Sequence, residues 1–391
     1  MAMLVGGIVY AWSVVKVPLA SEFGWSISQL SLNYTLVMCC FCIGTIVGGI
    51  LIKRFKLSLI IIISGILAGS GFIITSMQTG KLWLLYLAYA VCSGTGIGCF
   101  YIVLLTTVNS WFPEKRGFSS GCLQMGYGVS TMVFGTILDS LFNNENVGWR
   151  KAYALFGILI VIVLVLAGLI IKKPGPNDVL PEIKGSNEKQ KEVFTSRDYE
   201  VGEMVRSGKF WLIFMYLTFV GSVGGCIISF AKDLVMSVGA AATLATTLVG
   251  IMSVFNGLGR VTVGIAYDIF GRKKTTIALT SFIFLVPIIM LISIFTHSLV
   301  CCIIGLVIIG YWHGSLSPTT SIYVSTLFGV KNFGVNYGIV GSNLMCSSLI
   351  ATVAGVILNE TNSYVYPFLM LIVFSGVAFI INLMINKGCD R

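Results

Sequence analysis

GIAYDIFGRKK, residues 264 to 274, ends a long apolar run with a short charged turn. A shorter version of it, GILIKRFK, occupies residues 49 to 56, where an earlier apolar run also ends in lysine and arginine. The two turns lie about 216 residues apart, and two further pairs of segments are separated by nearly the same distance along the chain. They are GTGIG (94–98) with GYWHG (310–314), and WFPEKRGFSSG (111–121) with LFGVKNFGVNYG (327–338). Repetition at one offset predicts two parallel copies of a single structural unit.

The composition predicts that both copies lie in a membrane. Of 391 residues, 56% are hydrophobic and only 10% are charged, which is more apolar side chain than a soluble core can enclose. A membrane-crossing helix needs roughly 20 apolar residues. Twelve such spans are present, at about 1–20, 27–52, 58–77, 83–110, 118–140, 152–171, 210–231, 241–267, 276–295, 299–327, 336–359 and 365–386.

One long charged break divides the twelve spans into two sets of six. It contains eight basic and seven acidic residues. We therefore predict an N-terminal six-helix bundle over residues 1–171, a cytoplasmic linker over 172–209 and a C-terminal six-helix bundle over 210–391. Two parallel six-helix bundles predict an all-α membrane protein of the major facilitator fold, with substrate bound between the bundles near the midplane.

Basic residues indicate the orientation of the chain. Most of its 25 lysines and arginines lie in the linker or in alternate short loops, and the side richer in them is the cytoplasmic one. We therefore expect a multi-pass protein of the cell membrane with both termini in the cytoplasm. The net charge of +10 is then an orientation signal and a surface for anionic lipid headgroups, and we expect no nucleic-acid partner. The first span begins directly at Met1, which suggests that the natural reading frame starts a few residues earlier.

The turn after the eighth span looks like the signature turn of the major facilitator fold, G-x-x-x-D-x-x-G-R-K. We expect Asp268 to cap a helix or to pair across a cytoplasmic gate, while Arg272 holds the inner surface. The first-half copy departs from the signature because Lys53 stands where the acid should be, followed by Arg54. These four residues form the candidate gate, and only its second half carries the acid.

Arg260 is a charge deep inside the eighth span. It precedes Asp268 by eight residues, which is roughly 12 Å of helix, and half of a hydrocarbon core is about 15 Å. An unpaired arginine at that depth costs at least ~2.5 kcal/mol. The acids nearest to the spans all lie at or near span ends: Asp139, Asp233, Asp268 and Glu360. We therefore predict that a mobile anion neutralises Arg260; the alternatives are snorkelling to an interface and a packing role through backbone carbonyls.

Five short motifs extend this interpretation: YAWS (10–13), FGWS (23–26), WFPEKRG (111–117), FNGLGR (255–260) and FGVKNFGVNYG (328–338). Together they resemble the oxalate/formate antiporter family of the major facilitator superfamily, which is related to the monocarboxylate transporters. The resemblance implies that Arg260 contacts a substrate carboxylate. It also implies an aromatic cage, for which ordinary packing is the alternative at each position: Tyr10, Tyr101, Tyr127 and Trp312.

The resemblance also points to differences from the family pattern. Oxalate exchangers carry a second cation, a lysine in the eleventh span, and that position is Asn343 here. With one cation, the site should favour a monocarboxylate of the formate, lactate or pyruvate type over oxalate, because a second carboxylate would be desolvated without a partner. Asn256, one helical turn before Arg260, can hold the guanidinium. In monocarboxylate transporters an acid at that place helps to carry the proton, so Asn256 argues against carboxylate-based coupling there.

Lys16 and His313 are the remaining candidates for proton coupling, with a snorkelling boundary lysine and a satisfied core histidine as alternatives. We predict a monomeric secondary transporter of a small organic anion, working by alternating access as an antiporter or a proton symporter. A carrier of a sugar, nucleoside or drug-like solute is the first alternative, and a non-transporting anion sensor is the second. No ATP-binding loop is found, and the cysteines lack a second pair or a His tract, so we expect no enzyme activity, cofactor or metal.

Overall fold

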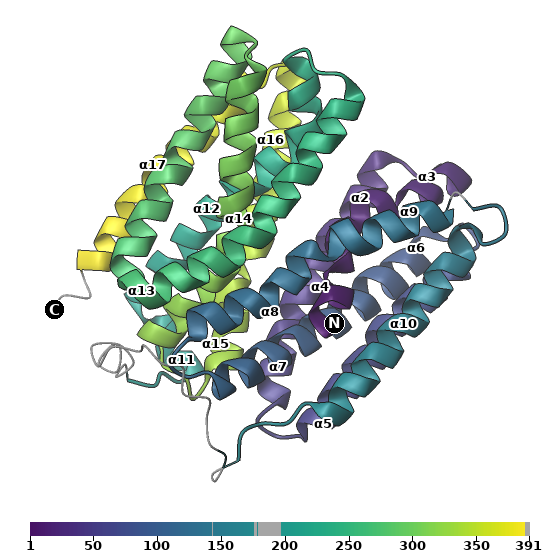
Figure 1. Ribbon diagram of the computed structural model, residues 1–391, viewed down its shortest axis with the longest axis vertical. Coiled ribbons are helices and arrows are strands. Elements are labelled where there is room, and N and C mark those ends of the chain that lie inside the picture. The colour runs from purple at the N-terminus through teal and green to yellow at the C-terminus, as the bar shows by residue number, and fades with distance from the viewer. Residues whose placement is uncertain (143, 176–177, 179–196, 388–391) are drawn as a thin grey trace. The chain divides into compact units, whose positions relative to one another are not determined.

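The computed structural model describes residues 1–142, 144–175, 178 and 197–387, and every regular element in this part of the chain is a helix (Figure 1). It contains two compact units. The first comprises Met1–Glu114, Gly126–Glu188 and Val330–Ser342. The second comprises Lys115–Met125, Lys189–Gly329 and Asn343–Arg391. Each unit thus includes a short segment from the opposite half of the sequence. The predicted bundles, 1–171 and 210–391, were drawn without this exchange of segments.

Six spans come from the first half of the sequence, and three of them are divided into shorter helices. In chain order the elements are α1 (Ala2–Gly6), η1 (Gly7–Ala11), α2 (Trp12–Val15) and α3 (Val17–Phe23); α4 (Ile27–Leu51); α5 (Leu57–Ser76); α6 (Leu82–Leu85), η2 (Tyr86–Gly94) and α7 (Thr95–Trp111); α8 (Arg116–Ser130), η3 (Thr131–Gly135) and α9 (Thr136–Phe142); and α10 (Gly148–Ile170). The elements η2 and η3 are π-helical and η1 is a 3-10 helix.

The second half supplies longer helices. They are α11 (Val201–Arg206), α12 (Gly208–Ser237), α13 (Ala242–Thr296), α14 (Leu299–Leu327), α15 (Phe333–Gly341), α16 (Asn343–Thr361) and α17 (Val365–Lys387). The short α11 lies within the predicted linker, most of which falls outside the described residues.

The helices occupy all twelve predicted spans, so the expectation of an all-α membrane protein is confirmed. Among the described residues, nine helical segments are long and apolar enough to cross a membrane. The difference from twelve has a local cause. The first span is broken into short pieces, the fifth is not among the nine, and the eighth and ninth form the single helix α13.

Glycine and capping residues set several of these boundaries. Gly24, with φ +63°, ends α3 in the left-handed conformation, and Ser26 then begins α4 through a capping box with Gln29. Gly271, with φ +75°, is the one residue inside α13 that is not helical. It is the glycine of the signature turn, and it separates the eighth span from the ninth. A residue with a side chain would adopt this backbone conformation only under strain.

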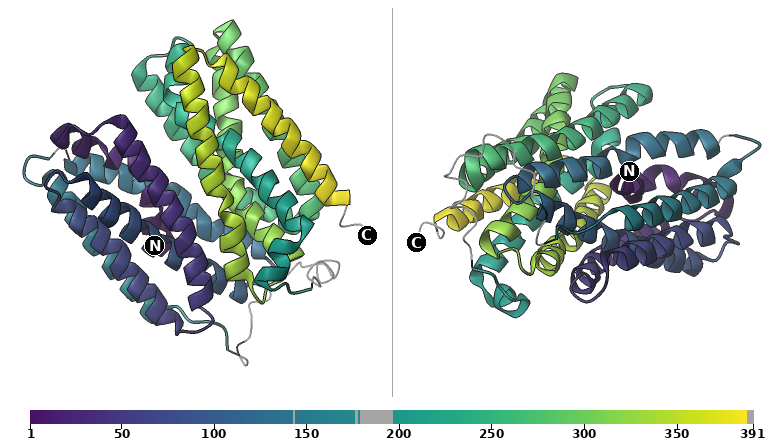
Figure 2. Two further views of the ribbon diagram at one scale, coloured as in Figure 1. Left: turned by 180° about the vertical axis from the view of Figure 1, so that it is seen from behind. Right: turned by 60° about the horizontal axis from the view of Figure 1, so that its bottom comes forward.

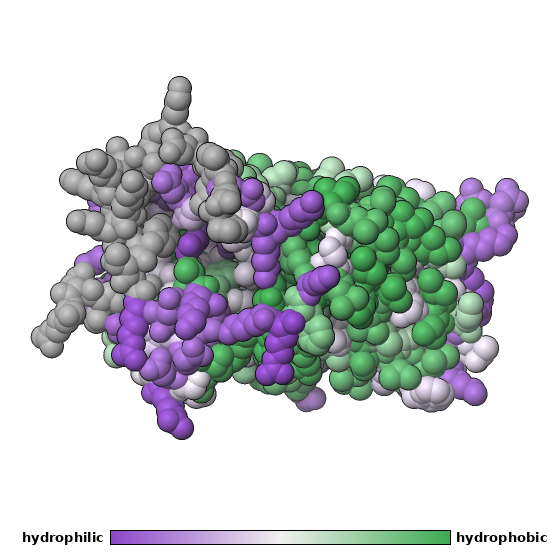
Figure 3. All heavy atoms as spheres, turned by 90° about the horizontal axis from the view of Figure 1, so that it is seen from below, coloured by the Kyte–Doolittle hydropathy of each residue, from purple (hydrophilic) through white to green (hydrophobic). Residues whose placement is uncertain are grey.

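The outer helices present apolar stripes suited to lipid. On α10 the exposed residues recur at helical spacing: Leu155, Ile158, Ile162, Leu166 and Leu169. In the view of Figure 3, exposed hydrophobic residues, in green, form a broad region, and hydrophilic residues, in purple, lie mainly toward its two ends. Within the first unit, α5 lies along α10 (Figures 1 and 2), and Gly69 and Gly157 allow their backbones to touch.

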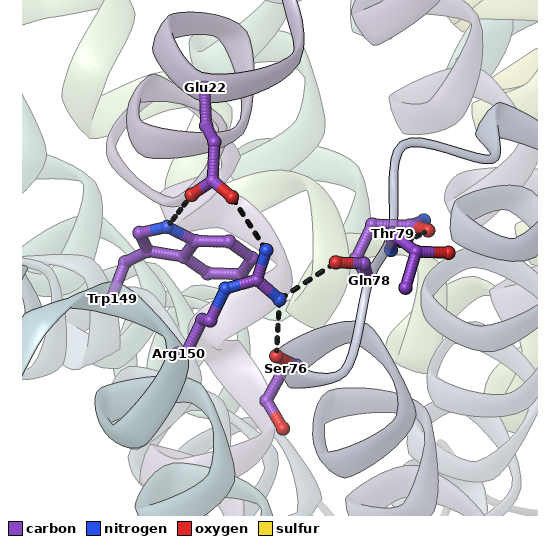
Figure 4. A network of polar contacts seen from close by, with 6 residues as sticks. All are labelled: Glu22, Ser76, Gln78, Thr79, Trp149 and Arg150. Carbon is purple, nitrogen blue, oxygen red and sulfur yellow. Dashed lines mark hydrogen bonds and ion pairs between the residues drawn. The ribbon is translucent and has the colours of Figure 1, made fainter.

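An ion pair joins three helix ends of the first unit (Figure 4). Arg150, at the start of α10, donates to the Glu22 carboxylate at 2.6 Å and to the carbonyl oxygens of Ser76 and Gln78 at 3.1 and 2.7 Å. The indole N–H of Trp149 donates to the other Glu22 oxygen at 2.6 Å, and the guanidinium lies 4.5 Å from the Trp149 ring centroid. This cluster fixes the end of the first span to those of the third and sixth.

We expect Glu22→Gln to lower the free energy of unfolding at pH 7 by about 0.5 to 1 kcal/mol, since both partners are about two-fifths exposed. The hydrogen bond from Arg150 lowers the pKa of Glu22. Its contribution is therefore complete above the ordinary carboxyl pKa and is lost as the pH falls through the lowered folded-state pKa. Thermal unfolding in detergent should show parent and variant converging below about pH 4. Glu203→Gln, in the more exposed pair with Arg197, is the control with a smaller effect, and a Glu22→Gln deficit that persists unchanged at pH 3 would contradict this account.

Candidate functional site

Arg260 lies within α13, eleven residues before the break at Gly271, and is 5% exposed. Its Nε donates to Asn256 Oδ1 at 3.3 Å, one turn earlier on the same helix. Among the described residues the ion pairs are Arg150–Glu22 and Arg197–Glu203, so no acid in this part of the chain pairs with Arg260. The Asn256 amide is neutral, so its hydrogen bond does not neutralise the positive charge of the guanidinium.

Close packing of α14 on α13 sets the surroundings of Arg260. A Cβ atom on Gly314 would overlap the carbonyl oxygen of Asn256, and one on Gly310 would overlap that of Met252. In the other direction, a Cβ on Gly259 would overlap the carbonyl oxygen of Tyr311. Small residues spaced four apart allow helix backbones to touch in lipid. The GYWHG motif therefore presses the turn 310–314 against the turn that carries Asn256 and Arg260.

We expect Gly314→Ala to destabilise the protein by about 1 to 3 kcal/mol, because the added methyl group must push two backbones apart. The same shift would displace Asn256, so substrate exchange should fall as well. The matched control is Gly225→Ala on α12, where nothing lies within 4 Å of an added Cβ. Thermal midpoints and exchange rates measured on both variants check this prediction, and equal effects of the two changes would contradict it.

His313 extends the polar contact of Arg260. Asn256 Nδ2 lies 3.2 Å from His313 Nδ1. Because Asn256 Oδ1 receives the guanidinium, its Nδ2 is the donor, and the ring nitrogen Nδ1 accepts. The His313 proton then sits on Nε2, and the three side chains form a chain from guanidinium to amide to imidazole. The candidates Asn256, Arg260 and His313 are thus brought together in the second unit.

Trp312 and Asn343 also belong to the second unit and are 3% and 1% exposed. The indole N–H of Trp312 donates to the carbonyl oxygen of Leu279 at 2.9 Å, which ties α14 to the second span of α13. This donor is already engaged, so the geometry favours the packing alternative for Trp312. Asn343 begins α16, directly after the end of α15 at Gly341 and the single residue Ser342.

An aromatic cluster in the first unit contains two cage candidates. The rings of Tyr101 and Tyr127 lie 5.4 Å apart at 65°, and Phe41 lies 5.4 Å from Tyr101. The hydroxyl of Tyr101 is 3.0 Å from that of Tyr337 on α15. Tyr101 and Tyr127 are 4% and 1% exposed. The side chain of Tyr10, the third candidate, lies outside the described part of the structure.

The signature turn caps a helix, as Asp268 was expected to do. Its carboxylate accepts the backbone N–H groups of Gly117 and Phe118 at 3.1 and 2.8 Å, at the start of α8 in the second unit. These N–H groups have no partner within their own helix, and the positive end of its dipole favours an anion. The guanidinium of Arg272 lies 5.6 Å from the ring centroid of Tyr323.

The first-half copy of the turn makes a different contact. Lys53 donates to the side-chain oxygen of Asn332, the residue before α15, within the first unit. The repeat places α15 over α8, so this bond is the counterpart of the Asp268 cap with a cation in place of the acid. Arg54 is exposed, and Lys16 lies between α2 and α3 with intermediate exposure.

Two buried residues, Phe41 and Gln124, were missed from the sequence. Phe41 carries no motif, because one aromatic residue in an apolar span does not differ from its neighbours. Gln124 on α8 is fully buried. It could have been selected from the sequence, because an amide in an apolar span is costly to bury unless it is hydrogen-bonded.

Comparison with known proteins establishes the family. The model of the Major Facilitator Superfamily matches residues 1–238 and 221–386. The chain belongs to the major facilitator superfamily. Members of this superfamily are transporters, so the chain is an integral membrane transporter and the prediction that it is not an enzyme is confirmed.

Individual superfamily members support the resemblance found in the motifs. An oxalate:formate antiporter of Oxalobacter formigenes is 26% identical over 382 residues, covering 96% of this chain and 87% of that protein. Monocarboxylate transporter 12 of Xenopus laevis is 22% identical over 379 residues, covering 92% and 80%. The crystal structure of the fucose:proton symporter of E. coli superposes with a TM-score of 0.66 at 15% identity over 98% of each chain, which is a likeness of fold.

Proposed function

We propose that this transporter carries a small organic anion, a monocarboxylate of the formate, lactate or pyruvate type, whose carboxylate binds Arg260. The observation that carries the proposal is the buried guanidinium at Arg260, which is held by the Asn256 amide and is not paired with an acid in the described residues. A planar fork of donors suits a carboxylate, which can accept two parallel hydrogen bonds.

The charge of the site supports a monoanion over a dianion. One carboxylate at ~4 Å from a guanidinium gains about 4 kcal/mol at an effective dielectric constant of 20. A second carboxylate would need another cation, and the position that carries a lysine in the oxalate exchangers is Asn343 here. We infer that oxalate is a poorer substrate than a monocarboxylate, although the similar protein of Oxalobacter formigenes is an oxalate:formate antiporter.

His313 is the coupling candidate that the geometry favours over Lys16. A proton on Nδ1 would end its bond from Asn256 and would place a second positive charge next to the Arg260 guanidinium. A bound carboxylate offsets that repulsion, so anion and proton would bind together. Uptake accelerated by an inward proton gradient would indicate symport, whereas a requirement for substrate on the opposite side would indicate antiport.

We infer that the chain resides in the cell membrane with both termini in the cytoplasm, on the distribution of its basic residues. In this orientation the turns at Lys53 and Asp268 face the cytoplasm and belong to the inner gate. Labelling of single cysteines placed at each terminus by a reagent that cannot cross the membrane tests the orientation, and labelling from outside would contradict it.

The experiment that tests the substrate class is counterflow into liposomes containing the purified full-length protein. Radiolabelled formate, lactate, pyruvate and oxalate are compared at equal concentrations, and unlabelled sugars and nucleosides are added as competitors. We expect monocarboxylates to exchange fastest and neutral solutes not to compete. A carrier of a neutral solute would instead show competition by that solute, and a sensor would bind carboxylates without counterflow.

A further inference from the structure

Gln124 is a buried amide for which the described residues supply no partner. Its side chain is fully buried on α8, and neither Nε2 nor Oε1 has a hydrogen bond within the described residues. Native proteins pair nearly all buried polar atoms, and an amide with both ends unpaired is a position where a ligand or water completes the bonding.

The packing of α8 against α13 places Gln124 near Arg260. A Cβ on Gly117 would overlap the carbonyl oxygen of Gly264, and a Cβ on Gly121 would overlap that of Arg260. The two helices therefore run antiparallel in this stretch, which lies wholly within the second unit. Gln124 follows Gly121 by three residues and shares its face of α8. Because residue 117 faces residue 264 and residue 121 faces residue 260, Gln124 faces the turn of α13 that contains Asn256.

This placement indicates which part of a bound substrate could form a hydrogen bond with the Gln124 amide. One helical turn is about 5.4 Å, and Gln124 lies just under one turn along α8 from the contact between Gly121 and the Arg260 carbonyl, on the side of the turn that contains Asn256. The amide presents one donor end and one acceptor end. A hydroxyl group can satisfy either end and can donate to Oε1, whereas a keto oxygen can only accept from Nε2.

We propose that Gln124 is a specificity residue of the carboxylate site, where its amide bonds the hydroxyl of a 2-hydroxy monocarboxylate and so favours it over the corresponding 2-keto acid. This inference rests on the proposed function. A site built to bond a hydroxyl discriminates against a substrate without that donor, because Oε1 then stays buried and unpaired.

The test compares lactate with pyruvate, which differ only in the group at carbon 2. Both enantiomers of lactate and pyruvate are assayed by counterflow with the full-length parent, Gln124→Met and Cys122→Ala in liposomes. We expect the parent to prefer one lactate enantiomer by about tenfold in kcat/KM. Gln124→Met, similar in volume but without the amide, should bring this ratio close to one. Cys122→Ala changes an exposed residue of the same helix and should keep the parent ratio.

A ratio that is the same in Gln124→Met and the parent would overturn the inference, as would a parent that prefers pyruvate. Should the methionine variant fail to fold, the rise in thermal midpoint of the parent with each acid supplies a second measurement, in which a pyruvate shift equal to or above that of lactate overturns it. The proposed function fails in a different way: a parent that exchanges neither acid, or an Arg260→Gln variant that exchanges both at the parent rate, removes the carboxylate site itself.

Discussion

Arg260→Gln will lower the exchange of every carboxylate by at least about a hundredfold. The estimate follows from the ~4 kcal/mol that one carboxylate gains beside a guanidinium in a site of intermediate dielectric, since each 1.4 kcal/mol corresponds to a factor of ten. Glutamine keeps most of the volume and can still bond Asn256, so the change removes the charge with little loss of packing. Counterflow rates in liposomes, normalised to the amount of monodisperse protein, measure the effect.

Arg260→Lys is the matched variant for this prediction. It keeps the positive charge as a point charge and loses the planar fork, so we expect partial activity, about tenfold below the parent. Exchange rates that fall in the order parent, Arg260→Lys, Arg260→Gln would support an anion that is held both by the positive charge and by the planar geometry of the guanidinium. Exchange by Arg260→Gln at the parent rate would show that the guanidinium serves packing, which was the alternative considered from the sequence.

Asn343→Lys will convert the transporter toward oxalate. In the proposed site of the parent, a second carboxylate would be desolvated without a cation, at a cost of several kcal/mol. By the resemblance to the oxalate exchangers, a lysine at Asn343 would supply that second cation. We expect the ratio of oxalate to lactate exchange to rise by about a hundredfold, corresponding to roughly 2.8 kcal/mol. Because Asn343 is 1% exposed, the buried ammonium should also lower the thermal midpoint of the protein without substrate, and oxalate should restore it.

Two controls separate charge from size in this experiment. Asn343→Met has a similar length without the charge and should leave the parent preference for monocarboxylates. The double variant Asn343→Lys with Arg260→Gln contains one cation and should not gain oxalate exchange. If the single lysine variant kept the parent ratio, Asn343 would not face the substrate and the explanation for monocarboxylate preference would be lost.

Much of the fold follows from local sequence. The twelve spans are visible because a helix in lipid must satisfy its own backbone and cover itself with apolar side chains, both of which are properties of a contiguous stretch. The break at Gly271 could be placed from the GRKK turn for the same reason, although the chain continues there as one helix, α13. The interruptions at η2 and η3 were not foreseen, since a π-helical turn depends on the packing of neighbouring helices.

The candidate site divides in a similar way. Arg260 could be selected from sequence alone because a charge in an apolar span is conspicuous and its cost can be estimated. Its bond to Asn256 was also accessible, since residues four apart on a helix are neighbours. The pairing of Asn256 with His313 and the engagement of the Trp312 N–H by Leu279 were not accessible, because each joins helices or spans far apart in sequence.

The sequence by itself determined the membrane, the repeat, the superfamily and the position of Arg260 inside an apolar span, because hydrophobic length, internal similarity and a charge within an apolar run are carried by short stretches of chain. Only the tertiary structure decided which polar atoms meet. The contact of Asp268 with the start of α8, that of Lys53 with Asn332 and the burial of Gln124 beside the Arg260 turn all depend on glycine faces that bring distant helices into backbone contact. Hydrogen bonds act over about 3 Å, so their partners are set by that packing and not by position along the chain.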